Sequence, residues 1–404
     1  MGWRFKGNEK KYVTKILDND FSFKKNSMNE RLEKLFSKVH KQKYAITCNS
    51  GTATLHSILN SFGVGHGDEV IIPSLTVAMC GFVVWQCGAV PVYADVNPKT
   101  FLIEPNDIEK KITKKTKAIM AVHIYGLMAD MEKIMGIAKK NNLFVVEDCA
   151  QCYLATDNKG RIAGTIGDAA SWSFEHTKHL STGDGGIVTT SNKNLATKIR
   201  KFAGVGFKNI TAERGKKRID KDKFQNPNWI RHDMFAYNYR MPEICAAVGL
   251  AQTEKIKFFI KKRIEAGLAF LLAIKKLNSD LIIPQETPKD YKHSYYTFAC
   301  IFNGKKYGIK WQKFRKKFIE YGGDGIYAAW KTVNQEIPFL KARNNGLYSG
   351  KMKLSNSYGW GETPNAIRIQ KKIMQFTTNQ KNKTGINKQI NALIKTINYF
   401  IKKN

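Results

Sequence analysis

Short apolar runs alternate with segments of helical periodicity along the first half of the chain. Runs typical of buried strands occur at residues 44–48, 69–73, 90–95, 118–123, 143–147, 169–174 and 186–190. Helical patterns separate several of these runs. Strands that alternate with helices favour a mainly parallel sheet that is covered by helices on both faces. The sequence therefore predicts an α/β fold built on one large sheet.

A long helical stretch marks the predicted boundary between two domains. The chain has 404 residues, 43% of them hydrophobic, which is enough for two domains. A helical pattern from residue 242 to about 277 can bridge them, and the later segments are shorter, more β-like and more basic. We predict a large domain at 1–278, with a helical N-terminal segment, and a small C-terminal α+β domain at 279–404. A polar, basic stretch within the large domain, residues 207–233, is predicted to be a long loop.

Residues 70–94 carry no charged side chain and are long enough to span a bilayer. Pro73, Pro91, Gly81 and Gly88 interrupt this run. The pattern therefore favours a strand, a buried helix at 77–87 and a second strand over one membrane helix. We expect no membrane partner.

The chain is strongly basic, with 67 Lys and Arg against 33 Asp and Glu and a formal net charge of +34. Such a charge is compatible with a nucleic-acid partner or with a Lys-rich solvated surface. We favour the solvated surface, because the basic residues form no compact arm and no stacking aromatic motif accompanies them. Nucleic acid is therefore not the expected partner.

The cysteine pattern predicts reduced thiols. Seven cysteines, together with the absence of a signal-peptide pattern, favour a cytoplasmic location. Cys149 and Cys152 have C-x-x-C spacing, but no second pair accompanies them. We predict buried thiols there and no metal site.

Three segments carry residue types suited to one kind of chemistry. At residues 44–57, Ser50, Gly51 and Thr52 lie where a helix begins, and free N–H groups there favour a phosphate, although a simple N-cap is the alternative. Asp148 ends an apolar strand, at the edge where α/β proteins bind ligands, although it could only cap the next helix. Lys178 lies between two strand-like runs and can act as a Schiff-base nucleophile, although most lysines in such a chain are merely exposed.

Together, the three segments favour a pyridoxal-phosphate (PLP) enzyme. In such an enzyme a carboxylate keeps the pyridine nitrogen protonated, so that the ring acts as an electron sink, and a lysine holds the aldehyde. Taken singly, each segment would favour its alternative explanation. Their order within one α/β domain is what makes the PLP interpretation the better one.

Five segments resemble, in order and spacing, the sugar-nucleotide aminotransferases of the DegT/DnrJ/StrS type. They are NSGTATL (49–55), EDCAQ (147–151), GDAASWSFEHTKHLSTGDGG (167–186), YNYRMPEICAAVGL (237–250) and QKKIMQFTTN (370–379). The resemblance covers most of the chain and implies the fold type I aminotransferase architecture, with PLP as cofactor.

The resemblance also implies roles for individual residues. Lys178 would hold the cofactor and return a proton to the sugar carbon, Asp148 would pair with the pyridine nitrogen, and Gln151 would lie near the phenolic oxygen. The remaining cofactor-binding residues would surround the phosphate: Ser50, Gly51, Thr52, Ser173, Asn238 and Arg240. Asn238 would come from the neighbouring subunit, so the implied active form is a homodimer with shared active sites.

Several positions depart from the family pattern. Val77 stands where an aromatic residue usually stacks on the cofactor ring, and Glu175, with His176 beside it, stands where many members have histidine. Thr-Pro-Asn-Ala-Ile at 363–367 lacks the usual carboxylate. A histidine in place of the lysine marks a 3-dehydrating branch of the family, so Lys178 argues against that branch.

The expected activity is the transamination of a nucleotide-linked keto-deoxysugar, an NDP-4-keto-6-deoxyhexose, with L-glutamate as amino donor. The loop 207–233, with Lys208 and Arg231, and Lys331 are candidates for contacting the substrate diphosphate. Two alternatives stay open. One is a PLP-dependent sugar-nucleotide dehydratase of the same family, and the other is an inactive, nucleic-acid-binding regulatory protein on this fold.

Overall fold

The computed structural model describes residues 2–18, 26–213, 221–345 and 362–401. Its large domain is built on a seven-stranded sheet with the order β1-β7-β6-β5-β4-β2-β3. The strands are β1 Tyr44–Cys48, β2 Glu69–Pro73, β3 Val90–Ala94, β4 Thr116–Val122, β5 Phe144–Asp148, β6 Ala169–Ser173 and β7 Gly186–Thr190. The pairs from β6 to β3 are parallel, whereas β7 is antiparallel to both β6 and β1. The prediction of a mainly parallel sheet is confirmed, and each strand begins and ends within two residues of its predicted place.

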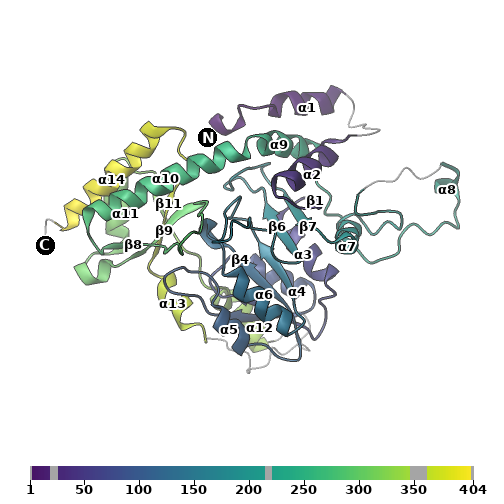
Figure 1. The fold of residues 1–404 in the computed structure, drawn as a ribbon, viewed down its shortest axis with the longest axis horizontal. Helices are drawn as coiled ribbons and strands as arrows, with labels where there is room; N and C mark the ends of the chain where they lie inside the picture. Colours follow the sequence, from purple (N-terminus) through teal and green to yellow (C-terminus); the bar gives the residue numbers. More distant parts are fainter. Residues whose placement is uncertain (1, 19–25, 214–220, 346–361, 402–404) are drawn as a thin grey trace.

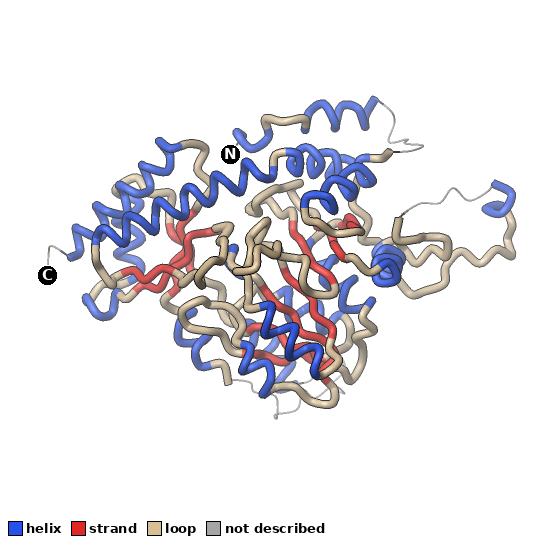
Figure 2. Tube along the Cα trace, viewed as in Figure 1, coloured by secondary structure: helices blue, strands red, loops and turns tan. Residues whose placement is uncertain are grey.

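Helices cover both faces of this sheet (Figures 1 and 2). The helices of the large domain are α1 Glu9–Asp18, α2 Met28–Val39, α3 Gly51–Ser61, α4 Met79–Gln86, α5 Pro105–Lys110, α6 Met131–Lys140, α7 Lys193–Ala203, α8 Lys221–Gln225 and α9 Glu243–Glu254. Every residue of β2, β6 and β7 is buried. Burial on both faces explains why a parallel strand such as β2 is uniformly apolar after its first residue.

The uncharged run at 70–94 folds as predicted, into β2, α4 and β3. Within the ranges given above, no helix is both long and apolar enough to cross a membrane. The predicted helix at 242–277 is instead two helices, because the backbone leaves the helical conformation at Lys255, which ends α9 before α10 Ile256–Leu277 begins. The predicted loop at 207–233 contains the short helix α8; its residues 214–220 lie outside the described chain.

A second sheet is wholly antiparallel and has the order β10-β11-β9-β8. Its strands are β8 Ile282–Pro284, β9 Thr297–Phe302, β10 Ile326–Ala328 and β11 Ile373–Thr377. The later helices are α11 Trp311–Glu320, α12 Ile337–Asn345, α13 Pro364–Gln370 and α14 Lys383–Ile401. Helix α10 extends from the large sheet to the small one, where α14 lies beside it and α11 lies beside α14 (Figure 1).

Two hydrophobic cores accompany the two sheets. The smaller core includes Phe298, Phe314 and Phe376, and the larger one surrounds the seven-stranded sheet. Phe339 of α12 belongs to the larger core, where its ring stacks on Phe82. Segments beyond residue 278 thus contribute to both cores, and the division at that position stays a prediction.

Candidate active site

Lys178 lies in the turn that joins β6 to β7, and its side chain is buried, with 8% exposed. Its amide N–H donates to the carbonyl oxygen of Glu175 at 3.0 Å, which closes the turn. The amine Nζ lies over the ring of Tyr296, 5.0 Å from the centroid. Glu175 also stabilises the turn through its side chain, because its Oε2 accepts hydrogen bonds from the N–H and the hydroxyl of Thr177. The turn therefore presents one buried amine on a rigid backbone.

Asp148 is the last residue of β5, and its register partner is Ser171 on the neighbouring strand β6. The turn that carries Lys178 follows β6. The Oδ1 atom of Asp148 accepts the Ala150 N–H at 3.0 Å, and its Oδ2 accepts the Cys80 thiol at 3.4 Å. Burial raises the pKa of the Asp148 carboxyl, while the Ala150 N–H and the positive charge of Lys178 oppose the rise. Asp148 is thus a buried carboxyl group whose ionised form is favoured by the nearby charge of Lys178.

The N-terminus of α3 lies against the same strand, β6. Ser50 is the N-cap, and its Oγ accepts the Ala53 N–H at 3.1 Å. The hydroxyls of Thr54 and Ser171 hydrogen bond at 2.6 Å and so tie α3 to β6. Within the described chain the N–H groups of Gly51 and Thr52 have no acceptor, as is usual where a helix begins.

Gly51 permits the close contact between α3 and β6. A Cβ at this position would lie 2.8 Å from the Cβ of Ser173, a separation that real Cβ atoms essentially never show. The absence of a side chain thus keeps the first turn of α3 and Ser173 together. Free N–H groups, the helix dipole and adjacent hydroxyls make this turn suitable for binding a phosphate group.

Gln151 is held by the backbone of Tyr125, whose N–H donates to Gln151 Oε1 at 2.8 Å. Tyr125 has a left-handed backbone, with φ of 62°, which directs this N–H. Because Oε1 is occupied as an acceptor, the amide NH₂ of Gln151 is left to donate to another group. That arrangement suits a ligand oxygen.

These residues fit PLP. Among the described residues, the only donor to the Oδ2 atom of Asp148 is a weak one, the Cys80 thiol, so a cationic ring N–H would supply the partner that this buried carboxylate lacks. Lys178 would hold the aldehyde, the first turn of α3 with Ser173 the phosphate, and Gln151 the phenolic oxygen. Val77, in place of a stacking aromatic residue, is half-buried and packs against the larger core.

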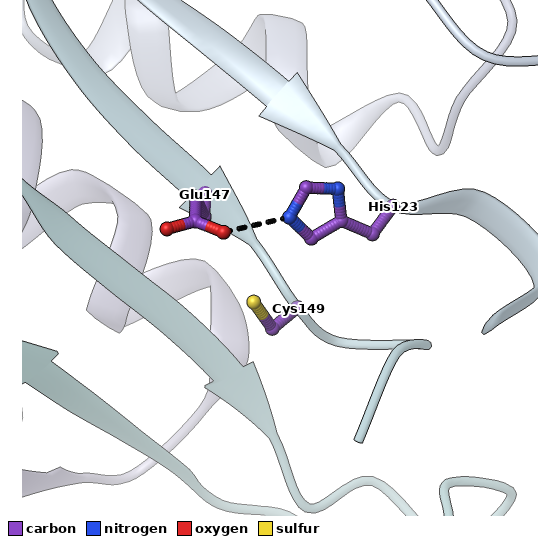
Figure 3. A group of neighbouring side chains, drawn as sticks. All are labelled: His123, Glu147 and Cys149. Carbon is purple, nitrogen blue, oxygen red and sulfur yellow. Dashed lines mark hydrogen bonds and ion pairs between the residues drawn. The ribbon is translucent and has the colours of Figure 1, made fainter. Parts of the chain in front are cut away.

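Glu147 and Cys149 flank Asp148 in the sequence, and with His123 they have potential ligand atoms within 4.8 Å of one another (Figure 3). His123 Nδ1 accepts the Ala129 N–H, so its Nε2–H donates to Glu147, 2.9 Å away. The Glu147 carboxylate also accepts the N–H groups of Gly164, Ile166 and Gly167. Burial raises the pKa of the Cys149 thiol well above its usual value. The ligand atoms of His123 and Glu147 are thus engaged in hydrogen bonds that hold the end of β5, and the absence of a metal site stays a prediction.

Asn238 and Arg240 flank Tyr239, whose carbonyl oxygen accepts the Asn49 N–H at 2.8 Å, beside the start of α3. Both side chains are exposed, and Arg240 Nε donates to Asn238 Oδ1 at 2.9 Å. Neither contacts Lys178 or Asp148 in the described chain. Their exposure next to the predicted phosphate site is compatible with contacts to a second subunit.

The predicted substrate-binding residues lie apart from Lys178. Arg231 lies over the ring of Trp229, 5.9 Å from the centroid, and the Arg231 carbonyl accepts the Lys208 N–H at 2.9 Å. Lys331 is exposed and follows β10 closely. Among the residues that the structure describes, none of these three contacts Lys178 or Asp148.

Four residues that contact the site were missed by the sequence interpretation: Arg4, Cys80, Arg263 and Tyr296. Cys80 lies in the apolar run that first suggested a membrane helix, where a thiol gives no local signal. Arg4 and Arg263 belong to a chain with 67 Lys and Arg, and only their burial distinguishes them.

A buried carboxylate at a strand end, a buried lysine after the next strand and an open helix N-terminus define a fold type I PLP-dependent enzyme. The sequence matches the DegT/DnrJ/EryC1/StrS aminotransferase family over residues 4–324, and the chain belongs to this family. It is accordingly a PLP-dependent aminotransferase.

Individual relatives support this assignment. The chain is 38% identical over 295 residues to a GDP-perosamine synthase of Escherichia coli O157:H7, covering 73% of this chain and 75% of the relative. It is 32% identical over 365 residues to the spore coat polysaccharide biosynthesis protein SpsC of Bacillus subtilis, covering 90% and 87%. The crystal structure of an aminotransferase from Psychrobacter cryohalolentis is 25% identical, with a TM-score of 0.80, covering 98% and 96%.

Proposed function

We propose that this protein transfers an amino group from L-glutamate to a nucleotide-linked keto sugar, an NDP-4-keto-6-deoxyhexose. The observation that carries the proposal is the convergence of Lys178, Asp148 and the first turn of α3 at one edge of the sheet. The similarity to a GDP-perosamine synthase makes a GDP-linked sugar the first substrate to test. The seven free cysteines support a cytoplasmic location for the reaction.

When bound, PLP would supply an electron sink and an aldehyde able to take up the amino group. Asp148 would hold the ring nitrogen in its protonated form, and burial of the carboxylate would strengthen that charge pair. Lys178 would hold the cofactor, then act as the base that moves a proton between the cofactor carbon and the substrate carbon. Gln151 would orient the ring, and the α3 turn with Ser173 would bind the phosphate.

We propose further that the working form is a homodimer, in which Asn238 of one subunit completes the phosphate site of the other. The exposure of Asn238 and Arg240 beside the start of α3 supports this arrangement. Mixing Lys178→Ala with Asn238→Asp subunits tests it. Each variant alone should have little activity, and the mixture should recover part of it, because one site in the mixed dimer would have both residues intact. No recovery, with mixed dimers demonstrated by mass spectrometry, would refute a shared site.

The substrate diphosphate is proposed to contact Lys208, Arg231 and Lys331. Alanine at each position should raise the KM for the sugar nucleotide and leave kcat for the glutamate half-reaction unchanged. Lys193, an exposed lysine paired with Glu213, provides a control that should change neither value. An unchanged KM in all three variants would eliminate this part of the proposal.

The direct test incubates the purified protein with PLP, L-glutamate and a GDP-linked 4-keto-6-deoxyhexose, and measures products by mass spectrometry. The proposal predicts an amino sugar nucleotide and 2-oxoglutarate in equal amounts. A deoxygenated sugar without added nitrogen would identify the dehydratase alternative. No product with any nucleotide sugar, combined with tight and salt-dependent nucleic-acid binding, would favour the regulatory protein.

A further inference from the structure

The backbone of the lysine turn is held by two buried guanidinium groups from distant parts of the chain. Arg4 donates through Nη1 to the carbonyl of His176 at 3.0 Å, and through Nη2 to that of Lys178 at 2.6 Å and that of His179 at 3.3 Å. Arg263, on α10, donates through Nη2 to the carbonyls of Thr177 at 3.0 Å and Lys178 at 3.3 Å. Four successive carbonyls of the turn, including that of Lys178 itself, are thus bound to arginine.

Arg263 also contacts the small domain. Its Nη1 donates to the carbonyl of Tyr296, which precedes β9, at 2.6 Å, and to the hydroxyl of Thr378, which follows β11, at 3.4 Å. Its guanidinium lies over the Tyr296 ring, 5.5 Å from the centroid, and the same ring lies under the amine of Lys178. One side chain therefore connects the lysine turn to two strands of the second sheet.

Neither guanidinium has a carboxylate within ion-pair distance among the described residues, although both are buried, with 3% and 5% exposed. Burial lowers the pKa of Arg4, although the negative charge of Glu175 opposes this shift, and burial followed by the charge of Arg4 lowers the pKa of Arg263. A buried cation without an anion is costly. An apolar side chain at either position would leave carbonyls of the lysine turn without a donor, so the two arginines determine how this turn is held.

We infer that Arg4 and Arg263 are positioning residues for Lys178. Their N–H groups fix the carbonyls of the turn, so the lysine side chain leaves a rigid backbone toward Asp148 and the start of α3. Their positive charges lie next to the cofactor's attachment point. This inference rests on the proposed role of Lys178 as the lysine that holds PLP.

The test compares Arg263→Met, Arg263→Lys, Arg4→Met and Arg4→Lys with a buried arginine elsewhere. Arg200 is the control, because it is 8% exposed and donates to the carbonyls of Ala45 and Ala212, and none of its hydrogen bonds within the described chain is with the lysine turn. Unlike Arg4 and Arg263, it also forms an ion pair with Glu33. Each variant is loaded with PLP, and the visible absorbance of the bound cofactor is titrated with pH. The rate of the spectral change after L-glutamate addition is measured separately.

The methionine variants should slow the glutamate half-reaction about 10- to 100-fold, because a displaced reactive group loses that much rate. They should also move the pH midpoint of the visible band upward, since loss of a nearby positive charge favours a protonated cofactor linkage. Arg263→Lys should keep a midpoint close to that of the wild type but react slowly, because one ammonium does not reproduce the guanidinium fork. Arg200→Met should lower the melting temperature without changing the midpoint.

Variants that bind PLP with an unchanged midpoint and a half-reaction rate within about twofold of wild type would overturn the inference. If a methionine variant fails to fold, the lysine variant at the same position tests the inference through the rate of its glutamate half-reaction. A wild-type protein that binds PLP but does not respond to glutamate would instead refute the proposed function, so the two failures are distinguishable.

Discussion

The thiol of Cys80 and the carboxylate of Asp148 form a buried hydrogen bond, with Sγ 3.4 Å from Oδ2. A thiol is a weak donor, and the stronger Ala150 N–H occupies the other oxygen. The carboxylate is therefore buried with one oxygen poorly satisfied. Such a group is costly alone and favourable beside a cation, which is the property that a partner for a protonated ring nitrogen requires.

Asp148→Asn should stabilise the cofactor-free protein at neutral pH and impair the enzyme. Because the folded-state pKa of Asp148 is raised by burial, its contribution to stability is present below its unfolded pKa of about 3.9 and is lost as pH rises through the folded value. Asparagine avoids that loss, so the melting temperature should exceed that of wild type at pH 7, with the difference vanishing in acid. Activity should fall about 10²- to 10³-fold. A variant less stable at pH 7 yet fully active would contradict this account.

Gly51→Ala should weaken PLP binding at least about tenfold, because the new Cβ would meet Ser173 where the phosphate is expected. Alanine in a helix is otherwise favourable. Gly136→Ala, in α6, is the matched control, since an added Cβ there meets no atom within 4 Å. The control should raise the free energy of unfolding by about 0.5–1 kcal/mol and leave PLP affinity unchanged. Fluorescence titration with PLP measures the affinity of both variants. Equal affinities in Gly51→Ala and Gly136→Ala would contradict the prediction.

Glu147→Gln should destabilise the fold by roughly 1–3 kcal/mol, because an amide NH₂ would face N–H donors that now bind a carboxylate. Burial alone would raise the pKa of Glu147, but the hydrogen bond and charge of His123 and two backbone N–H groups lower it overall. Its contribution is therefore present above the unfolded pKa of about 4.3 and lost as pH falls through the folded value. Urea melts at pH 7 and pH 4 should show a smaller difference in acid.

The metal interpretation of the same group has its own test. Zinc titration of the PLP-loaded protein should show no specific binding that depends on Glu147, because the ligand atoms of His123 and Glu147 are occupied by hydrogen bonds. Zinc bound with one-to-one stoichiometry in the wild type, and lost in Glu147→Gln, would show that the group binds a metal after all.

The positions of the strands along the chain could be predicted because each is a short and largely buried run of mostly apolar residues. The break at Lys255 could not be predicted in the same way, since neither Pro nor Gly marks it and α9 and α10 share one continuous helical pattern. Similarly, α12 carries Phe339 back to the large sheet, a long-range contact that local periodicity does not reveal.

The residues of the candidate site also fall into those that the sequence predicts and those that only the folded structure identifies. Ser50 and Asp148 were predictable because each stands at the end of a recognisable element, where ligands bind in α/β folds, and Lys178 because it lies between two strand-like runs. Cys80, Tyr296, Arg4 and Arg263 act through burial and through contacts across more than sixty positions of sequence. Arginine at an ordinary place in a basic chain carries no local signal, so only the folded structure identifies these residues.

The measurement that tests the central claim most directly is the absorbance spectrum of the PLP-loaded protein before and after L-glutamate is added. The account predicts a band near the visible edge that moves toward the ultraviolet with glutamate, and no such change in Lys178→Ala. Borohydride reduction followed by peptide mass spectrometry should find the cofactor attached to Lys178. No bound PLP, attachment at another lysine, or a glutamate response that persists unchanged in Lys178→Ala would contradict the account.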